Sequence, residues 1–159
     1  MPRRELIEER LTHSVIGAFF EVYNGLGFGF LEHLYVVALE HELVARGHRV
    51  ARELCVRVMY KDSELGEQRL DMVVDDKLVV ETKSTRKLYP GADRQVYNYL
   101  RATNLEVGLL LHFGPEPKFY RVVCLNEKNR AFAPNKNDQK NQRHPADSGH
   151  PKTDSVREA

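Results

Sequence analysis

Two acids and a lysine interrupt an otherwise apolar stretch in the middle of the sequence. Residues 70–83 are mostly apolar and β-branched, a composition typical of two buried strands joined by a tight turn. Side chains alternate between faces along a strand, so Glu81 and Lys83 share one face. Unpaired buried charge is costly. A divalent metal held by Asp71 and Glu81, with Lys83 beside it, would explain why these charges are present.

The length of the turn decides whether Asp71 and Glu81 lie on the same face. Residues directly opposite each other in an antiparallel pair share a face. A two-residue loop would place Asp71 on the wrong face. A three-residue loop over residues 75–77 pairs Val74 with Leu78 and brings the two acids opposite each other. We therefore predict the longer loop, or a bulge of equivalent effect.

A plainer interpretation of these residues stays open. Lys83 could form an ion pair with the acids on a solvated face of the sheet, because ion-pair networks can imitate functional sites. Two apposed carboxylates without a metal would repel each other, which raises the pKa of at least one of them. The metal interpretation therefore predicts a metal affinity that depends on pH.

The overall charge does not indicate a partner, but its distribution does. The 159 residues are 42% hydrophobic and 30% charged, with a net charge of +1. Residues 83–101 carry five Lys or Arg against the single acid Asp93. Such a cluster suits phosphate contacts, with Arg86, Lys87 and Arg94 as candidate substrate-binding residues. A run this short is also typical of a solvated face.

The cysteines and the N-terminus indicate a cytoplasmic protein. Cys55 and Cys124 lie in strand-like segments without metal-ligand spacing, which suggests reduced thiols. The N-terminus leads into an acidic amphipathic stretch and not into an apolar signal core. No apolar run approaches the length of a membrane span, so we expect no membrane partner.

Hydrophobic periodicity predicts the order of the remaining elements. Apolar residues recur at helical spacing in three segments and alternate or run continuously in five others. The sequence predicts an α/β fold in which a three-strand meander is joined through a helix to a strand parallel to one of its members. We expect helices over residues 4–24, 30–46 and 93–102, strands over 49–60, 67–74, 78–84, 107–113 and 118–125, and a hairpin loop over 61–66.

Single residues mark the expected ends of the three helices. Gly25 and Gly47 are predicted to close the first two helices as C-terminal caps, and Asp93 is predicted to cap the start of the third. From residue 126 onward large apolar side chains are nearly absent. We therefore predict one folded domain over residues 1–125 and a disordered polar tail over 126–159.

Four short motifs follow one another in an order that resembles a known family. The arrangement is similar to the GxxExxY protein family, a branch of the PD-(D/E)xK nuclease superfamily, over roughly residues 5–125. The resemblance implies a restriction-endonuclease-like core, in which helices flank a mixed central sheet. The motifs are Gly29-x-x-Glu32-x-x-Tyr35, Arg69-Leu70-Asp71, Val80-Glu81-Thr82-Lys83 and Gln95-x-x-x-Tyr99-Leu100.

The resemblance implies a metal site for Mg²⁺ or Mn²⁺. Asp71 and Glu81 match the metal-binding acids, and Glu32 matches a helix acid that completes the metal shell. The backbone carbonyl of Thr82 is expected to meet the metal. An aliphatic residue is more usual at position 82, and Leu70 replaces the proline of the superfamily name; we interpret both departures as harmless.

The resemblance also implies the remaining catalytic roles. Lys83 matches the lysine that orients or activates the attacking water and steadies developing charge. Gln95 and Tyr99 match a motif on the following helix that helps to position substrate or water. The expected catalytic set is Asp71, Glu81, Lys83, Glu32, Gln95 and Tyr99.

Two functions from different classes remain after this comparison. The first is a metal-dependent nuclease that hydrolyses nucleic acid, with DNA the expected substrate. A homodimer would suit it, because one small domain cuts one strand at a time. The alternative is a non-catalytic module that retains the nuclease fold and binds nucleic acid or protein, because a fold does not by itself prove activity.

Overall fold

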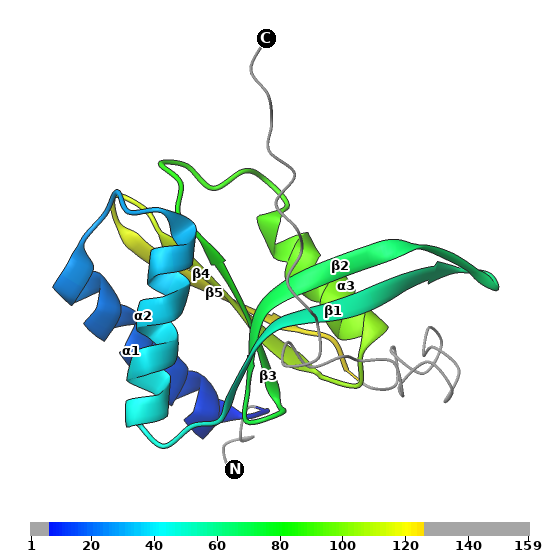
Figure 1. Ribbon diagram of the computed structural model, residues 1–159, viewed down its shortest axis with the longest axis horizontal. Coiled ribbons are helices and arrows are strands. Elements are labelled where there is room, and N and C mark those ends of the chain that lie inside the picture. Colours follow the sequence, from blue (N-terminus) through cyan, green and yellow to red (C-terminus); the bar gives the residue numbers. More distant parts are fainter. Residues whose placement is uncertain (1–6, 126–159) are drawn as a thin grey trace, which may run out of the picture.

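The computed structural model describes residues 7–125, and the predicted order of eight elements is confirmed. A five-stranded sheet lies between two layers of helices (Figure 1). The predicted tail, residues 126–159, lies outside the described residues. The elements are α1 (Glu9–Leu26), α2 (Glu32–Ala45), β1 (Val50–Tyr60), β2 (Ser63–Val74), β3 (Leu78–Lys83), α3 (Ala92–Ala102), β4 (Val107–Phe113) and β5 (Pro117–Val123).

The strands lie in the order β1-β2-β3-β4-β5, and the predicted parallel crossover is confirmed. Strands β3 and β4 pair in parallel through α3, whereas every other neighbouring pair is antiparallel. Strand β4 is buried along its whole length, and β3 is buried everywhere except Lys83. Helices cover both faces of these strands, which explains the apolar first half of β3 and the mostly apolar β4.

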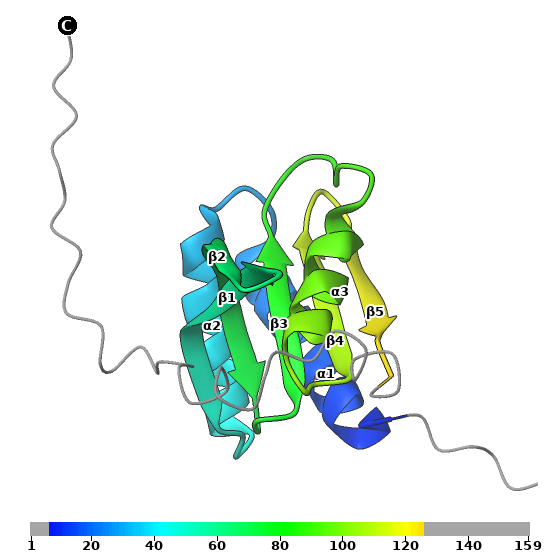
Figure 2. The same ribbon diagram turned by 90° about the vertical axis from the view of Figure 1, so that its right-hand side faces the viewer.

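Two hydrophobic cores lie on opposite faces of the sheet. Helices α1 and α2 cover one face, and α3 covers the other (Figure 2). In the first core the Phe113 ring lies 4.7 Å from Phe19 and 4.3 Å from Tyr35 between ring centroids. In the second core Val96 and Leu100 of α3 are fully buried. Each large side chain buried in this way contributes about 1.5–3 kcal/mol.

The turn between β2 and β3 has the predicted register. Val74 pairs with Leu78, and the Lys77 N–H donates to the Val74 carbonyl at 3.0 Å. Asp75 and Asp76 adopt the left-handed conformation, with φ of 52° and 56°. Asp tolerates this region better than most residues, which explains two acids at this turn. The three-residue loop over 75–77 is confirmed.

Of the three predicted helix caps, one is confirmed. Gly47, with φ of 86°, follows α2, and its N–H donates to the Val44 carbonyl while the next residue bonds back to Leu43. Helix α1 continues past Gly25 to Leu26, so that cap is wrong. Helix α3 begins at Ala92 after Gly91 without a side-chain cap, so the prediction for Asp93 is also wrong.

The β1–β2 hairpin is longer than predicted and projects beyond the core (Figure 1). Tyr60 pairs with Ser63 across a two-residue turn, so the expected loop over residues 61–66 is wrong. Residues 61–69 are all exposed. A strand exposed on both faces shows no alternation of apolar and polar side chains, and the sequence therefore gave no signal for it.

A chain of side-chain hydrogen bonds joins α1, the end of α2 and the β2–β3 turn. Ser14 Oγ lies 2.7 Å from His48 Nε2, and His48 Nδ1 lies 2.7 Å from Asp75 Oδ2. The Arg49 N–H donates to Asp75 Oδ1 at 2.8 Å. Ser14 lies inside α1, where the helix uses its backbone N–H. We interpret this series of hydrogen bonds as a cross-link that stabilises the fold.

The Asp75→Asn change should lower the free energy of unfolding by about 1 kcal/mol near neutral pH. Burial alone would raise the Asp75 pKa, but hydrogen bonds from Arg49 and His48 outweigh it and hold the pKa below 3.8. A carboxyl whose pKa is lower in the folded protein than in the unfolded chain stabilises the fold at any pH above the unfolded-state pKa. This contribution is lost as the pH falls through the folded-state pKa. Urea unfolding at pH 7 and pH 3 should therefore give a difference that shrinks in acid. Exposed Asp62→Asn serves as the control, and a difference independent of pH would contradict the interpretation.

Candidate active site

Asp71 lies where β2 separates from β3. The ladder between these strands ends at the Met72–Val80 pair, one step before Asp71 and Glu81. Asp71 Oδ2 accepts the Thr82 N–H at 2.7 Å and the Thr82 hydroxyl at 2.8 Å. The carboxylate therefore takes the place of a main-chain partner and is held beside β3.

Glu81 and Lys83 lie on the face of the sheet that α3 covers. Val79 belongs to the core under α3, and side chains two and four residues later share its face. Lys83 Nζ lies 3.2 Å from Glu81 Oε1. The ion pair of the plainer interpretation is therefore present, but Glu81 is only 4% exposed, so it does not lie on a solvated face.

Burial places the Glu81 carboxyl under electrostatic strain. Burial and, secondly, the Asp71 carboxylate raise the pKa of Glu81 to about 7, although Lys83 partly opposes them. For Lys83, burial alone would lower the pKa. The attraction of Glu81, Glu32 and Asp71 outweighs burial and raises it, so Lys83 stays a cation.

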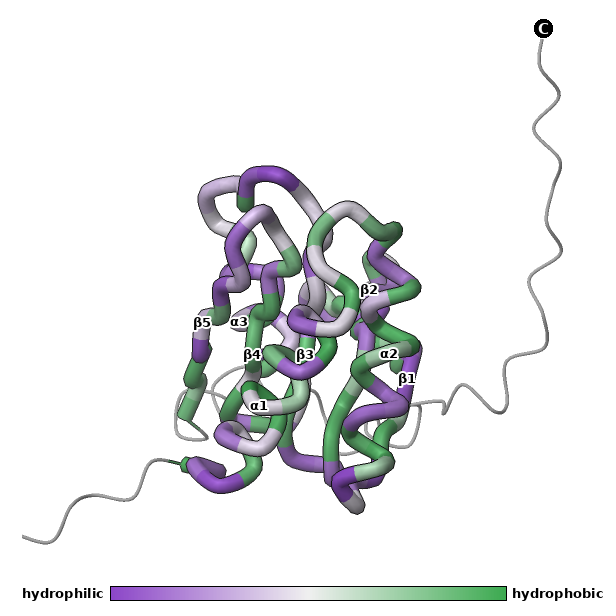
Figure 3. The backbone as a smooth tube through the Cα atoms, turned by 90° about the vertical axis from the view of Figure 1, so that its left-hand side faces the viewer, coloured by the Kyte–Doolittle hydropathy of each residue, from purple (hydrophilic) through white to green (hydrophobic). Residues whose placement is uncertain are grey.

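Glu32 reaches the end of β3 from the first turn of α2. Its Oε2 accepts the Ser84 N–H at 3.3 Å, directly after Lys83. The Ser84 hydroxyl donates to the Phe30 carbonyl at 2.7 Å. The connector between α1 and α2 and the loop after β3 therefore lie at the same end of the molecule, which is at the top of Figure 3.

The contacts of Tyr35 explain why a tyrosine follows Glu32 by three residues. Its hydroxyl donates to the Gly27 carbonyl at 2.6 Å and accepts the Phe30 N–H at 3.2 Å. The buried ring fixes the connector that leads into α2. The spacing of Gly29, Glu32 and Tyr35 thus has a structural cause: the glycine turns the chain at φ of 113°, and the tyrosine holds the turn.

Tyr99 anchors α3 to β2 beside the acids. Its hydroxyl donates to the Arg69 carbonyl, two residues before Asp71, and accepts a 3.4 Å hydrogen bond from the Gln95 amide. The ring is 1% exposed, and burial raises the pKa of its hydroxyl to about 12. Tyr99 therefore links α3 to the strand that carries Asp71, and Gln95 lies beside it.

The three basic candidates are all exposed near this end of the site. Arg86 lies in the loop after β3, with its guanidinium carbon 6.0 Å from the centre of the Phe28 ring. Lys87 follows in the same loop. Arg94 in the first turn of α3 lies 5.0 Å over the Tyr97 ring. All three can meet phosphate without moving the fold.

Two residues near the site escaped the sequence interpretation. The Thr82 hydroxyl holds Asp71, whereas the sequence suggested a role for its carbonyl alone. His112 pairs with Lys83 across β3 and β4, and its Nε2–H donates to the Thr85 carbonyl at 2.8 Å. It is 4% exposed, and its Nδ1 has no hydrogen-bond partner. A single histidine in an apolar strand was the available signal.

The side chains at the end of β3 fit a divalent cation bound through few protein ligands. Glu81 Oε2 is buried without a hydrogen-bond partner, and the Asp71 carboxylate is held next to it. Oxygen ligands suit Mg²⁺, which keeps several waters and usually takes one or two carboxylates. Within residues 7–125, no group of three or more His, Cys, Asp or Glu side chains is arranged to hold a metal. The fit therefore rests on two acids and not on a closed cage.

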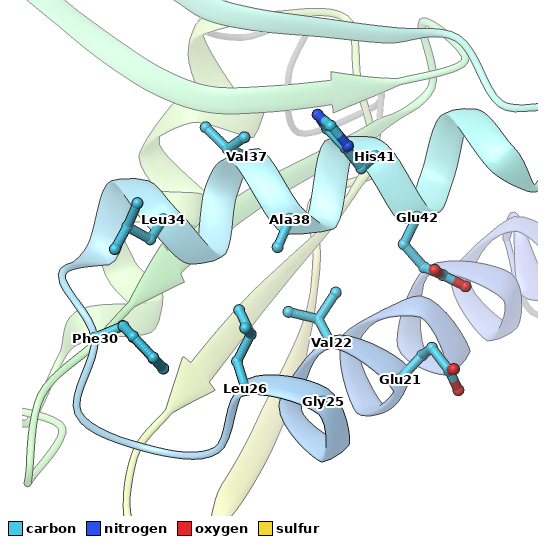
Figure 4. A pocket seen from close by; sticks show the side chains of 10 residues that line it. All are labelled: Glu21, Val22, Gly25, Leu26, Phe30, Leu34, Val37, Ala38, His41 and Glu42. Carbon is cyan, nitrogen blue, oxygen red and sulfur yellow. The ribbon is translucent and has the colours of Figure 1, made fainter.

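A hollow between α1 and α2 lies on the other face of the sheet (Figure 4). Its walls are apolar, with Leu26 and Leu34 among them, and it carries the acids Glu21 and Glu42. Phosphate would be repelled by these acids. The hollow contains no residue of the predicted site.

Among residues 7–125, no helix is long and apolar enough to cross a membrane.

One known family matches most of the chain. The sequence model of the PD-(D/E)XK nuclease superfamily matches residues 9–122. No curated protein matches the chain. A solved structure described as "Crystal structure of SSO0001" is 17% identical with a TM-score of 0.47, over 77% of this chain. The chain spans 63% of the length of that structure.

The architecture defines the class of protein. A mixed sheet with a parallel central pair, flanked by helices on both faces, is a restriction-endonuclease-like core. The superfamily match covers most of the described residues. The chain belongs to the PD-(D/E)XK nuclease superfamily.

Proposed function

We propose that this chain is a metal-dependent nuclease that hydrolyses phosphodiester bonds in nucleic acid, with DNA as the first substrate to test. The observation that carries the proposal is the buried Glu81 carboxylate, which has one oxygen on Lys83 and the other without a partner. Membership of a nuclease superfamily supports it. The contacts of Glu32 and Tyr35 further support membership of the GxxExxY branch.

Each residue then has a chemical role. Asp71 and Glu81 would hold Mg²⁺ or Mn²⁺. Glu32, which forms no ligand cluster with these two acids in the described residues, and the Thr82 carbonyl would join the shell when the ion binds. A divalent cation held there would supply Lewis-acid chemistry, which polarises a phosphodiester and lowers the pKa of a water nucleophile. Lys83 donates hydrogen bonds to the phosphoryl oxygens as their charge grows. Arg86, Lys87 and Arg94 hold the neighbouring phosphates.

Metal binding tests this proposal most directly. Titration of Mn²⁺ at pH 8 should give binding to wild-type protein and at least about tenfold weaker binding to Asp71→Asn protein, because one of two charged ligands is lost. Isothermal calorimetry measures both. Glu81 is largely deprotonated at pH 8, since its pKa is about 7.

The matched control is Asp76→Asn, the same change on the same hairpin at an exposed position paired only with Arg49. This variant should bind Mn²⁺ as the wild type does. Equal binding by all three proteins would place any metal elsewhere and contradict the assigned site. Binding that depends on Asp71, without cleavage of DNA or RNA, would instead favour the non-catalytic module.

A further inference from the structure

Three aromatic side chains are exposed at the end of the molecule where the proposed site opens. Phe28 is 39% exposed, Phe30 is 46% exposed and Tyr89 is 55% exposed. Phe28 and Phe30 lie in the connector before α2, and Tyr89 lies in the loop after β3. We call these three residues the aromatic rim. Single exposed apolar residues are ordinary, but a group beside a charged site suggests a binding surface.

Hydrogen bonds join the aromatic rim to the proposed site. Ser84 follows Lys83 directly, and its N–H donates to Glu32 while its hydroxyl donates to the Phe30 carbonyl. The Arg86 guanidinium lies over the Phe28 ring. The connector and residues 84–86 of the loop therefore lie side by side, and Tyr89 follows three residues later in the same loop.

Positive charge is concentrated beside the aromatic rim. Residues 7–125 carry fifteen Lys or Arg and seventeen Asp or Glu, a net charge of −2. Residues 83–101 alone carry five basic residues against one acid. Arg86 and Lys87 lie in the same loop as Tyr89, and both are exposed. A polyanion would therefore approach an otherwise acidic domain at this loop.

This combination favours unpaired nucleotides over a closed duplex. Strand-binding proteins combine a basic track for the backbone with aromatic rings on which bases stack. A duplex buries the faces of its bases and would leave the rings without a partner. The Phe28 ring already attracts the guanidinium of Arg86, whose carbon lies 6.0 Å from the ring centre, so a basic group and an aromatic face are available side by side.

We propose that the aromatic rim binds single-stranded nucleic acid and leads it to Glu81 and Lys83. The inference rests on the proposed nuclease function, because it assigns the substrate of that site. Bases stack on Phe28 and Tyr89, while Arg86 and Lys87 hold the phosphates. The Phe30 ring lines the hollow between α1 and α2, so Phe30 contributes its carbonyl contact with Ser84 and is not assigned a stacked base.

Binding of labelled oligonucleotides tests the proposal. Fluorescence anisotropy with Ca²⁺ compares a single-stranded DNA, the RNA of the same sequence and the blunt DNA duplex. Wild-type protein should bind at least one single strand more tightly than the duplex. Phe28→Ser and Tyr89→Ser should each weaken that binding by about tenfold, as expected when one stacked base is lost. Tyr120→Ser is the control: Tyr120 is 42% exposed on β5 and outside the aromatic rim.

The possible outcomes separate this inference from the nuclease proposal. Preference for the duplex, or equal losses in the Tyr120 control, would overturn the role of the aromatic rim. Cleavage by wild type and both rim variants at the same rate would also overturn it, while the nuclease proposal would stand. Binding of single-stranded nucleic acid that depends on the aromatic rim, without cleavage in Mg²⁺ or Mn²⁺, would support the binding role of the rim and contradict the nuclease proposal. Melting curves confirm that each variant is folded.

Discussion

Replacing Lys83 with methionine should slow phosphodiester cleavage by about 100-fold or more, the usual effect of removing one group that stabilises transition-state charge. Lys83 Nζ lies 3.2 Å from Glu81 Oε1, so its ammonium is held at the acid that would bind metal. Methionine retains most of the aliphatic stem and removes only the charge and the hydrogen bonds. Cleavage of a labelled oligonucleotide under single-turnover conditions measures the rate without a contribution from product release.

The control for this variant is Lys77→Met on the same hairpin. Lys77 is exposed, with its ammonium 3.9 Å from Glu8 and far along β3 from the acids. Its loss should leave the rate unchanged. Mn²⁺ titration into Lys83→Met protein separates lost chemistry from a lost metal site. A variant that binds metal and cleaves within about threefold of the wild-type rate would contradict the assigned role of Lys83.

The order of elements could be predicted because it depends on local patterns, and the register of the central hairpin could be predicted because Asp71 and Glu81 had to share a face. Apolar residues at a period of two or 3.6 determine which segments become strands or helices. The two faces of β3 are both buried, and a slip of one residue would have reversed every side chain between them. The turn at Asp75 and Asp76 then follows from the pairing of Val74 with Leu78.

The details of the site depended on contacts that no local pattern records. Asp71 was expected across from Glu81, but the strands separate at that point and Thr82 supplies the partner. Thr82 and Asp71 are eleven residues apart, and His112 meets Thr85 across 27 residues. Such pairs arise only when the sheet is assembled. The start of β2, residues 63–66, was missed for the opposite reason: these residues are all exposed, so no core contact produces an apolar pattern there.

Glu81→Gln should make the metal-free protein more stable at pH 8 while removing its metal site. Burial raises the pKa of Glu81 to about 7 from an ordinary value of 4.5. The folded protein therefore binds a proton more tightly than the unfolded chain, and stability falls as pH rises from 4.5 through 7. A shift of this size corresponds to about 3 kcal/mol as an upper figure. Glutamine fills the same space without ionising, so we expect a gain of about 1–3 kcal/mol.

Thermal melting in EDTA at pH 5 and pH 8 measures this effect. The variant should melt a few degrees above the wild type at pH 8 and close to it at pH 5, where the wild-type carboxyl is protonated. Exposed Glu116→Gln is the control and should follow the wild type at both values. Equal melting temperatures of Glu81→Gln and wild-type protein at pH 8 would contradict the inference that the ionised Glu81 carboxylate destabilises the fold.

Addition of Mn²⁺ should reverse the order at pH 8. The wild type gains stability in proportion to the logarithm of metal concentration over its dissociation constant, about 2.7 kcal/mol at a hundredfold excess. The glutamine variant lacks the charged ligand and gains little. Lys83 alone does not relieve the strain, because the pKa of Glu81 remains raised with the ammonium 3.2 Å away. At pH 8, where the carboxyl is largely ionised, a second cation at the unpartnered Oε2 would compensate the buried charge, so stability regained with metal would connect the raised pKa of Glu81 to the proposed function.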